Sequence, residues 1–273
     1  MHNLPGEWYP DMSQLQVSDR GGTSMMRFSP INDGKIVYAW GALTDGECDS
    51  LSNHFLDQRM QAVSVSGFVT GSHEVGSMRA TAWSPELADI FWKRWDNIIR
   101  GFFPERIMSD FSPTDWYAMP ATGCNPERRE HRYWKPVGIS PVLRFMKYEQ
   151  GGEHNTHYDM GYDYEGRDPN DHRRTLMSFV LYLTTCEEGT GGCTRFIEDG
   201  QADILTVQRN HEDWTERARH DQVLESSHPV KGKLMIFDHR MAHDVEPYTG
   251  STPRIIIRGD VIFEAVDIEV SIS

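Results

Sequence analysis

The stretch RFMKYEQGGEHNTHYD, residues 144–159, determines how the rest of this 273-residue chain is interpreted. An apolar strand pattern runs into a Gly-Gly turn and ends in His157-Tyr158-Asp159. On an extended strand, residues i and i+2 point to the same face, so His157 and Asp159 can reach one metal ion. A His-x-Asp pair alone is weak evidence, because the chain holds 12 His and 41 acidic residues. Any further ligand must come from elsewhere in the chain.

A second imidazole follows another apolar strand, in the segment LMIFDHRMAHDV at residues 234–245. Both His239 and His243 are candidates for the third ligand. We favour His243, because it is better placed relative to the turn at Pro247–Gly250 and to Arg254, which opens the next strand. Two His and one carboxylate with open coordination positions are typical of non-haem Fe(II) oxygenases. The sequence therefore predicts a metal site of His157, Asp159 and His243, with the cation of Arg254 beside it.

Other charged and imidazole side chains near these segments leave alternatives open. Arg254 could form only a surface ion pair, but Arg258 lies on the same strand face and favours a pocket for a carboxylate. His154 and His228 are interpreted as ordinary loop or strand-end histidines.

From Pro141 onward, short apolar strands alternate with Gly-rich or charged turns. The clearest strand candidates are Val142–Tyr148, Thr175–Leu183, Gly192–Ile197, Lys233–Phe237 and Ile255–Phe263. Two hydrophilic loops, Met160–Arg173 and Gln208–Ser227, lie between them. Because no crossover helices interrupt these strands, we expect an antiparallel sandwich or jelly roll.

The sequence of the N-terminal half predicts an irregular arm followed by helices that support the core. Residues 1–34 form the arm, residues 105–138 are loop with short strands, and Lys35–Trp40 and Val63–Val69 are strand candidates. Thr44 with Glu47 makes a capping box, and Ser84-Pro85-Glu86 is a second helix start. The apolar faces predicted for the two helices are Cys48, Leu51, Phe55 and Met60, and then Leu87, Ile90, Phe91, Trp95, Ile98 and Phe102. The expected fold is α+β: residues 1–140, the arm and helical support, pack on a jelly-roll core of residues 141–273 as one domain.

Bulk composition narrows the class of protein. The formal net charge of −14 disfavours nucleic acid as a partner and weakly favours a neutral or cationic substrate. Four widely spaced cysteines make no disulfide framework, and we expect Cys186 and Cys193 to be buried thiols in neighbouring strands. No signal-peptide pattern and no run of membrane-span length is found, so a cytoplasmic protein with no membrane partner is expected. The oligomeric state is left open.

These residues resemble the Fe(II)/2-oxoglutarate dioxygenases of the prolyl 4-hydroxylase type. The resemblance covers residues 141–263, and the N-terminal helices are similar to that family's helical support less distinctively. The matching positions, in order, are Arg144, Tyr148, Gly151-Gly152, His157, Asp159, Arg173-Arg174-Thr175, Gly191-Gly192-Cys193-Thr194-Arg195-Phe196, Lys231-Gly232, Phe237, His243 and Arg254. Two positions depart from the pattern: the Arg stands one or two places before Thr175 rather than three, and Arg254 replaces the usual Lys one position later. Because Arg also binds carboxylates, bidentately, we expect that function to be kept.

The resemblance implies a double-stranded β-helix enzyme in which His157, Asp159 and His243 hold Fe(II). The cosubstrate 2-oxoglutarate would chelate the metal and place its far carboxylate against Arg254 and the Tyr148 hydroxyl, and O2 would take the last position. Family halogenases have a small residue where Asp159 stands, which favours hydroxylation here, although desaturation or ring closure would use the same ligands. A small-molecule substrate, such as an amino acid or natural-product scaffold, is preferred over a prolyl residue in a peptide or protein, and a non-catalytic metal-binding jelly roll is the third alternative. Arg79 and Arg144 match family arginines near the pocket and could either contact substrate or form ordinary ion pairs.

Overall fold

The protein is described by a computed structural model covering residues 7–8, 17, 25–28, 36–56, 61–62, 74–102, 107–109, 132–159, 161–162, 164, 168, 170–198, 218–239 and 241–266. The two helices are α1 (Asp45–Leu56) and α2 (Pro85–Phe102), and a 3-10 turn spans His220–Gln222. The strands are β1 (Glu7–Trp8), β2 (Met25–Phe28), β3 (Ile36–Trp40), β4 (Gln61–Ala62), β5 (Glu74–Trp83), β6 (Ile107–Ser109), β7 (Arg132–Ile139), β8 (Val142–His157), β9 (Arg173–Tyr182), β10 (Thr194–Ile197), β11 (Val223–Ser227), β12 (Leu234–Asp238), β13 (His243–Val245) and β14 (Arg254–Val266).

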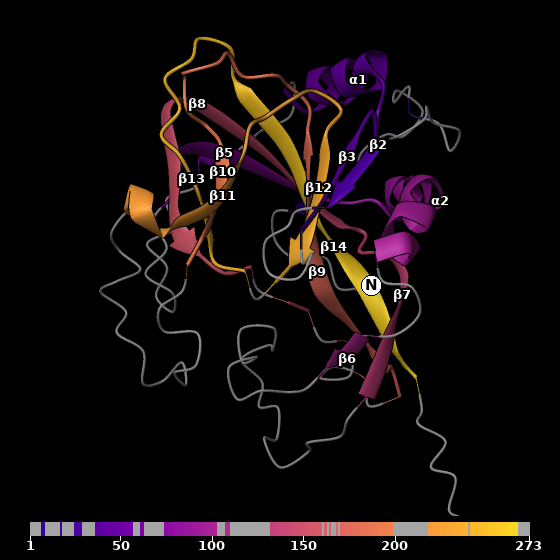
Figure 1. Ribbon diagram of the computed structural model, residues 1–273. Helices are drawn as coiled ribbons and strands as arrows, with labels where there is room; N and C mark the ends of the chain where they lie inside the picture. The colour runs from indigo at the N-terminus through magenta and orange to yellow at the C-terminus, as the bar shows by residue number, and fades with distance from the viewer. Residues whose placement is uncertain are drawn as a thin grey trace, which may run out of the picture.

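These strands form one curled sheet, in which the main path runs β11-β10-β13-β8-β14-β9-β12-β3-β2. Off this path, β5 pairs with β1, β4 and β8, and β7 pairs with β14 and β6. Every pairing in it is antiparallel except that of β1 with β5. The long strand β8 joins two layers: Arg144–Tyr148 pairs with β14, whereas His154 and His157 pair with β13. Between these parts the chain turns at Gly151, whose φ of 84° is a backbone conformation that favours glycine. The result is the expected double-stranded β-helix core, with β10, β11 and β13 on one side of the central strands and both helices on the other (Figure 1).

Successive side chains along the central strands point to opposite faces of the sheet, and this divides the core into two clusters. Odd-numbered residues of β8 and β9, such as Phe145 and Phe179, pack toward the helices, where Phe179 lies edge-on to Trp95 of α2. Even-numbered residues, such as Tyr148 and Tyr182, face the interior of the curled sheet. Because both faces are covered, these strands read as nearly continuous apolar runs in the sequence. The interior face is the one that carries the polar side chains described below.

Both predicted helix starts are present. The Thr44 backbone N–H donates to Glu47 Oε2 at 2.8 Å, and the Glu47 N–H donates back to Thr44 Oγ1 at 3.3 Å. The Leu87 N–H donates to Ser84 Oγ at 3.2 Å, so Ser84 caps α2. The predicted helix faces are buried at Cys48, Leu51, Phe55, Leu87, Phe91, Trp95 and Ile98, whereas Ile90 is only half-buried.

Several predicted boundaries are wrong in an instructive way. β8 continues past Tyr148 to His157, through a polar Gly-containing stretch that a propensity argument would end. The predicted loop Gln208–Ser227 contains β11, and β5 and β13 were not predicted, because their apolar residues are sparse. Cys186 and Cys193 are free but lie in the connection between β9 and β10, and Cys193 is only partly buried. Met60, Phe102's side chain and Val63–Val69 lie outside the described residues. Neither helix of the described part is long and apolar enough to cross a membrane.

Candidate active site

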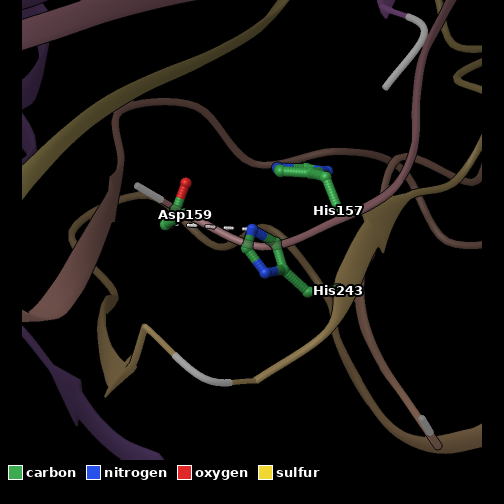
Figure 2. A group of neighbouring side chains, drawn as sticks. All are labelled: His157, Asp159 and His243. Atoms are coloured by element: carbon green, nitrogen blue, oxygen red, sulfur yellow. Dashed lines mark ion pairs between the residues drawn. The ribbon is translucent and has the colours of Figure 1, made fainter. Parts of the chain in front are cut away.

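Three side chains from separate parts of the sheet converge on one point. His157 ends β8, His243 begins β13, and the two stand directly opposite each other in the antiparallel ladder. Asp159 follows β8 by two residues. One ligand atom from each of the three side chains lies within 4.8 Å of the others, and Figure 2 shows all three directed toward a common space. The three residues are between 5% and 9% exposed, so any ion held there is largely shielded from water.

Both imidazoles present their Nε2 atoms to this space. The Nδ1 of His157 lies 2.7 Å from the Asn155 carbonyl oxygen, and the Nδ1 of His243 lies 2.9 Å from that of Met241. A carbonyl only accepts, so each Nδ1 carries the proton and each Nε2 keeps its lone pair. Burial, together with the neighbouring His243, lowers the pKa of His157 to about 3, which keeps its ring neutral. These are the tautomers that metal coordination requires.

Two side chains hold the carboxylate of Asp159. Ser178 on β9 donates from Oγ to Asp159 Oδ2 at 2.5 Å, and Arg258 on β14 places Nη2 3.1 Å from Oδ1. Burial opposes ionisation of Asp159, but Arg258, the two imidazoles and Ser178 together keep its pKa well below the usual range. Asp159 is therefore an ionised carboxylate held in one orientation. Ser178 was not predicted as a functional residue, although a serine inside the apolar run LMSFVLYL is a signal that could have indicated it.

Arg258 belongs to an ion-pair network rather than to a carboxylate pocket shared with Arg254. Its Nη2 also lies 3.0 Å from Asp260 Oδ1, and Arg144 Nη1 reaches Asp260 Oδ2 at 3.3 Å. The rejected ligand candidate, His239, directs Nε2 to Asp260 at 3.2 Å and lies outside the group of three converging ligands. Burial raises the pKa of Asp260, yet Arg258 and its other partners bring it down to about 2.

Arg254 lies fully buried on the interior face of β14, the face that also carries Arg258. Its guanidinium carbon lies 4.7 Å from the Tyr148 ring centroid and 5.6 Å from that of Tyr182, and Nη2 donates to Thr194 Oγ1 at 3.1 Å. The remaining Nε and Nη1 atoms are buried and have no hydrogen-bond partner among the described residues. A buried cation with unpaired N–H groups fits an anionic partner such as a carboxylate, which accepts charge-assisted hydrogen bonds.

The Gly191-Gly192 pair allows the chain to pass close to this arginine. Gly192 has a φ of 74°, and a Cβ placed on it would stand 2.9 Å from the Tyr248 ring and 3.3 Å from Arg254 Cδ. A larger residue would therefore be strained and would press on the arginine stem. Thr194 and Tyr182 lie against Arg254, and the sequence analysis assigned neither of them a role in the site.

The arrangement fits a divalent transition metal and a 2-oxo acid. Two neutral imidazoles and one carboxylate are the donor set of non-haem Fe(II) oxygenases. The orphaned donors of Arg254 supply a second anchor for an anionic cosubstrate. Of the imidazoles interpreted as structural, His228 lies near the Cys186 carbonyl oxygen (2.9 Å), whereas His154 stacks on His157 with a centroid distance of 3.6 Å.

Comparison with known proteins gives a family match for the core. Residues 143–259 match the sequence model of the 2OG-Fe(II) oxygenase superfamily. No curated protein matches the chain. Similar solved structures include the viral collagen prolyl hydroxylase of Paramecium Bursaria Chlorella virus-1 in its 2OG complex, with 18% identity, 86% of this chain and 99% of that chain covered, and a TM-score of 0.44. A Pseudomonas putida prolyl-4-hydroxylase is 13% identical, with 83% of this chain and 91% of that chain covered and a TM-score of 0.45. HygX from Streptomyces hygroscopicus with nickel and 2-oxoglutarate bound is 10% identical, with 84% of this chain and 82% of that chain covered and a TM-score of 0.48.

Proposed function

Because its core, residues 143–259, belongs to the 2OG-Fe(II) oxygenase superfamily, we propose that this enzyme hydroxylates an unactivated C–H bond of a small molecule. In this proposal His157, Asp159 and His243 hold Fe(II), and Arg254 and Tyr148 hold 2-oxoglutarate. The observation that carries the assignment is the convergence of three ligand atoms within 4.8 Å, together with a buried arginine that has two donors unpaired among the described residues. Succinate and CO2 are the expected coproducts.

The bound metal, 2-oxoglutarate and O2 supply the oxidising chemistry, and the protein supplies binding, orientation and exclusion of water. The Nδ1–H bonds to Asn155 and Met241 fix both imidazole planes, and Ser178 fixes the carboxylate. Arg254 fixes the far end of the cosubstrate. With these groups held by hydrogen bonds, the protein would keep the bound metal and 2-oxoglutarate in one orientation relative to the substrate.

Asp159 supports hydroxylation over halogenation, because its carboxylate occupies the position that a halide would need. Desaturation and ring closure use the same ligands, and the products formed would separate them. The low exposure of all three ligand residues favours a compact substrate that can enter a shielded site. A prolyl residue in a peptide or protein is the alternative substrate.

The test measures succinate release from 2-oxoglutarate by the Fe(II)-loaded enzyme, with a metabolite panel and a prolyl-peptide panel as separate arms. We expect a member of the metabolite panel to stimulate release and the peptides to leave it at the basal rate. Asp159→Ala is the control and should abolish stimulated release. Stimulation by the peptides alone would replace the small-molecule assignment, and stimulated release that survives in Asp159→Ala would refute the ligand assignment.

A further inference from the structure

Three arginines share the interior face with the converging ligands. Arg258 stands directly opposite Arg144 in the ladder between β14 and β8. Arg79 stands opposite Met146 in the ladder between β5 and β8, so it shares the face of Tyr148 and Arg144. Like charges placed directly opposite each other across strands are destabilising unless a counter-charge separates them. A positive region of this kind needs anions.

The two carboxylates that pair with these arginines each have other charged partners. Arg144 and Arg258 share one carboxylate, that of Asp260, at 3.3 Å and 3.0 Å. Asp159 also contacts Arg258, but the proposed function assigns its negative charge to the metal. Burial lowers the pKa of Arg144, and Arg258 and Arg79 lower it further, against the opposite pull of Asp260 and Asp159. Arg144 and Arg258 thus share one carboxylate besides the one assigned to the metal, although the chain as a whole carries a charge of −14.

Arg144 is more accessible to a solute than Arg258, with which it shares Asp260. Its side chain is 28% exposed, whereas those of Arg258 and Asp260 are 11% and 6% exposed. A single 3.3 Å contact joins it to Asp260, which leaves other N–H groups of the planar guanidinium for a second acceptor. Three successive ion pairs, Arg144–Asp260, Asp260–Arg258 and Arg258–Asp159, connect it to the group of converging ligands.

We propose that Arg144 binds a carboxylate group of the substrate, so that the enzyme acts on a small carboxylic acid whose oxidised carbon lies a few bonds from that group. The inference rests on the proposed function. It replaces the expectation, drawn from net charge, of a neutral or cationic substrate, because the local charge at the interior face is opposite in sign to that of the whole chain. The short chain of ion pairs between Arg144 and Asp159 sets the distance from the anchor to the reacting carbon.

The test is a thermal-shift screen of the enzyme loaded with Ni(II) and 2-oxoglutarate, so that no turnover occurs. The library pairs each small carboxylic acid, such as a free amino acid, with its own amide. We expect the stabilising compounds to be acids whose amides give no shift. In Arg144→Gln the apparent affinity for these acids should fall roughly tenfold or more, because a charge-assisted hydrogen bond is lost. Arg144→Lys should retain part of the affinity.

Arg219→Gln is the matched control, because Arg219 is an exposed arginine paired with Asp221 on the 3-10 turn. It should leave the acid shifts unchanged. Stabilisation by Ni(II) and 2-oxoglutarate alone reports the fold and the proposed function separately, and it should be the same in all four proteins. With that stabilisation intact, amides that shift as strongly as acids, a library without any stabilising acid, or acid shifts unaffected by Arg144→Gln would each overturn the proposal. If Ni(II) and 2-oxoglutarate do not stabilise the wild type, that result counts against the proposed function instead.

Discussion

Replacing Arg254 with methionine separates the stability of the fold from the binding of 2-oxoglutarate. The buried guanidinium has two ring contacts and one hydroxyl partner, and no carboxylate of the described residues pairs with it. Removing a guanidinium from water costs several kcal/mol, and a cation–π contact returns about 2 kcal/mol when desolvated. Replacing such a poorly compensated buried cation by an apolar residue of similar volume is neutral or stabilising. The unfolding free energy of Arg254→Met without cosubstrate should therefore be no lower than that of the wild type.

Binding of 2-oxoglutarate should change in the opposite direction. Losing one partner of a buried, hydrogen-bonded charge pair costs about 2–5 kcal/mol, which raises Kd roughly 30-fold to several thousand-fold. Urea unfolding without cosubstrate and calorimetric titration of the Ni(II)-loaded protein with 2-oxoglutarate measure the two effects separately.

Arg94→Met is the matched control. Arg94 is 3% exposed, lies on α2 and pairs with Glu47 at 2.6 Å. Breaking this pair should lower the unfolding free energy by about 3 kcal/mol while leaving the Kd for 2-oxoglutarate unchanged. The reasoning is refuted if Arg254→Met loses as much stability as Arg94→Met, or if it binds 2-oxoglutarate within threefold of the wild type.

Three further changes test the groups around the ligands. Ser178→Ala removes the donor to Asp159 and should weaken Fe(II) affinity about 10- to 100-fold in an anaerobic titration; unchanged affinity would show that the carboxylate needs no such support. Gly192→Ala introduces a strained residue against Arg254 and should raise the KM for 2-oxoglutarate by about tenfold or more with Fe(II) affinity unchanged, so equal KM values would contradict the close approach. The pKa of Asp260 is about 2, below its value in the unfolded chain, so its ionised form adds on the order of 2 kcal/mol of stability above about pH 4 that is lost as the pH falls toward 2. The stability difference between wild type and Asp260→Asn, measured by urea unfolding, should shrink over that range; a pH-independent difference would exclude this contribution.

The enzyme class, the cofactors and the jelly-roll core could be predicted because each depends on local pattern. His157 and Asp159 share a strand spacing, the apolar runs mark β9, β12 and β14, and the caps at Thr44 and Ser84 are short-range signals. The ordered motifs from β8 to β14 then indicated the family, which the match to residues 143–259 confirms.

The supporting shell of the site could not be predicted, because it depends on register between strands distant in sequence. Ser178 and Arg258 reach Asp159 only because β9 and β14 pair in the register that places residue 180 opposite residue 258. Arg258 was expected to form a carboxylate pocket with Arg254, since both lie on one face of β14. Instead it forms ion pairs with Asp159 and Asp260. The short strands β11 and β13 were not predicted, because pairing with β10, rather than a run of apolar residues, defines them.

The most direct test of the central claim is the visible absorption of the protein after anaerobic addition of Fe(II) and 2-oxoglutarate. Chelation of the ferrous ion by the keto acid should give a charge-transfer band in the wild type and in His239→Ala, whose imidazole lies outside the ligand group. The band should be absent in Asp159→Ala and in His243→Ala. A band that persists in His243→Ala but disappears in His239→Ala would contradict the proposed metal site.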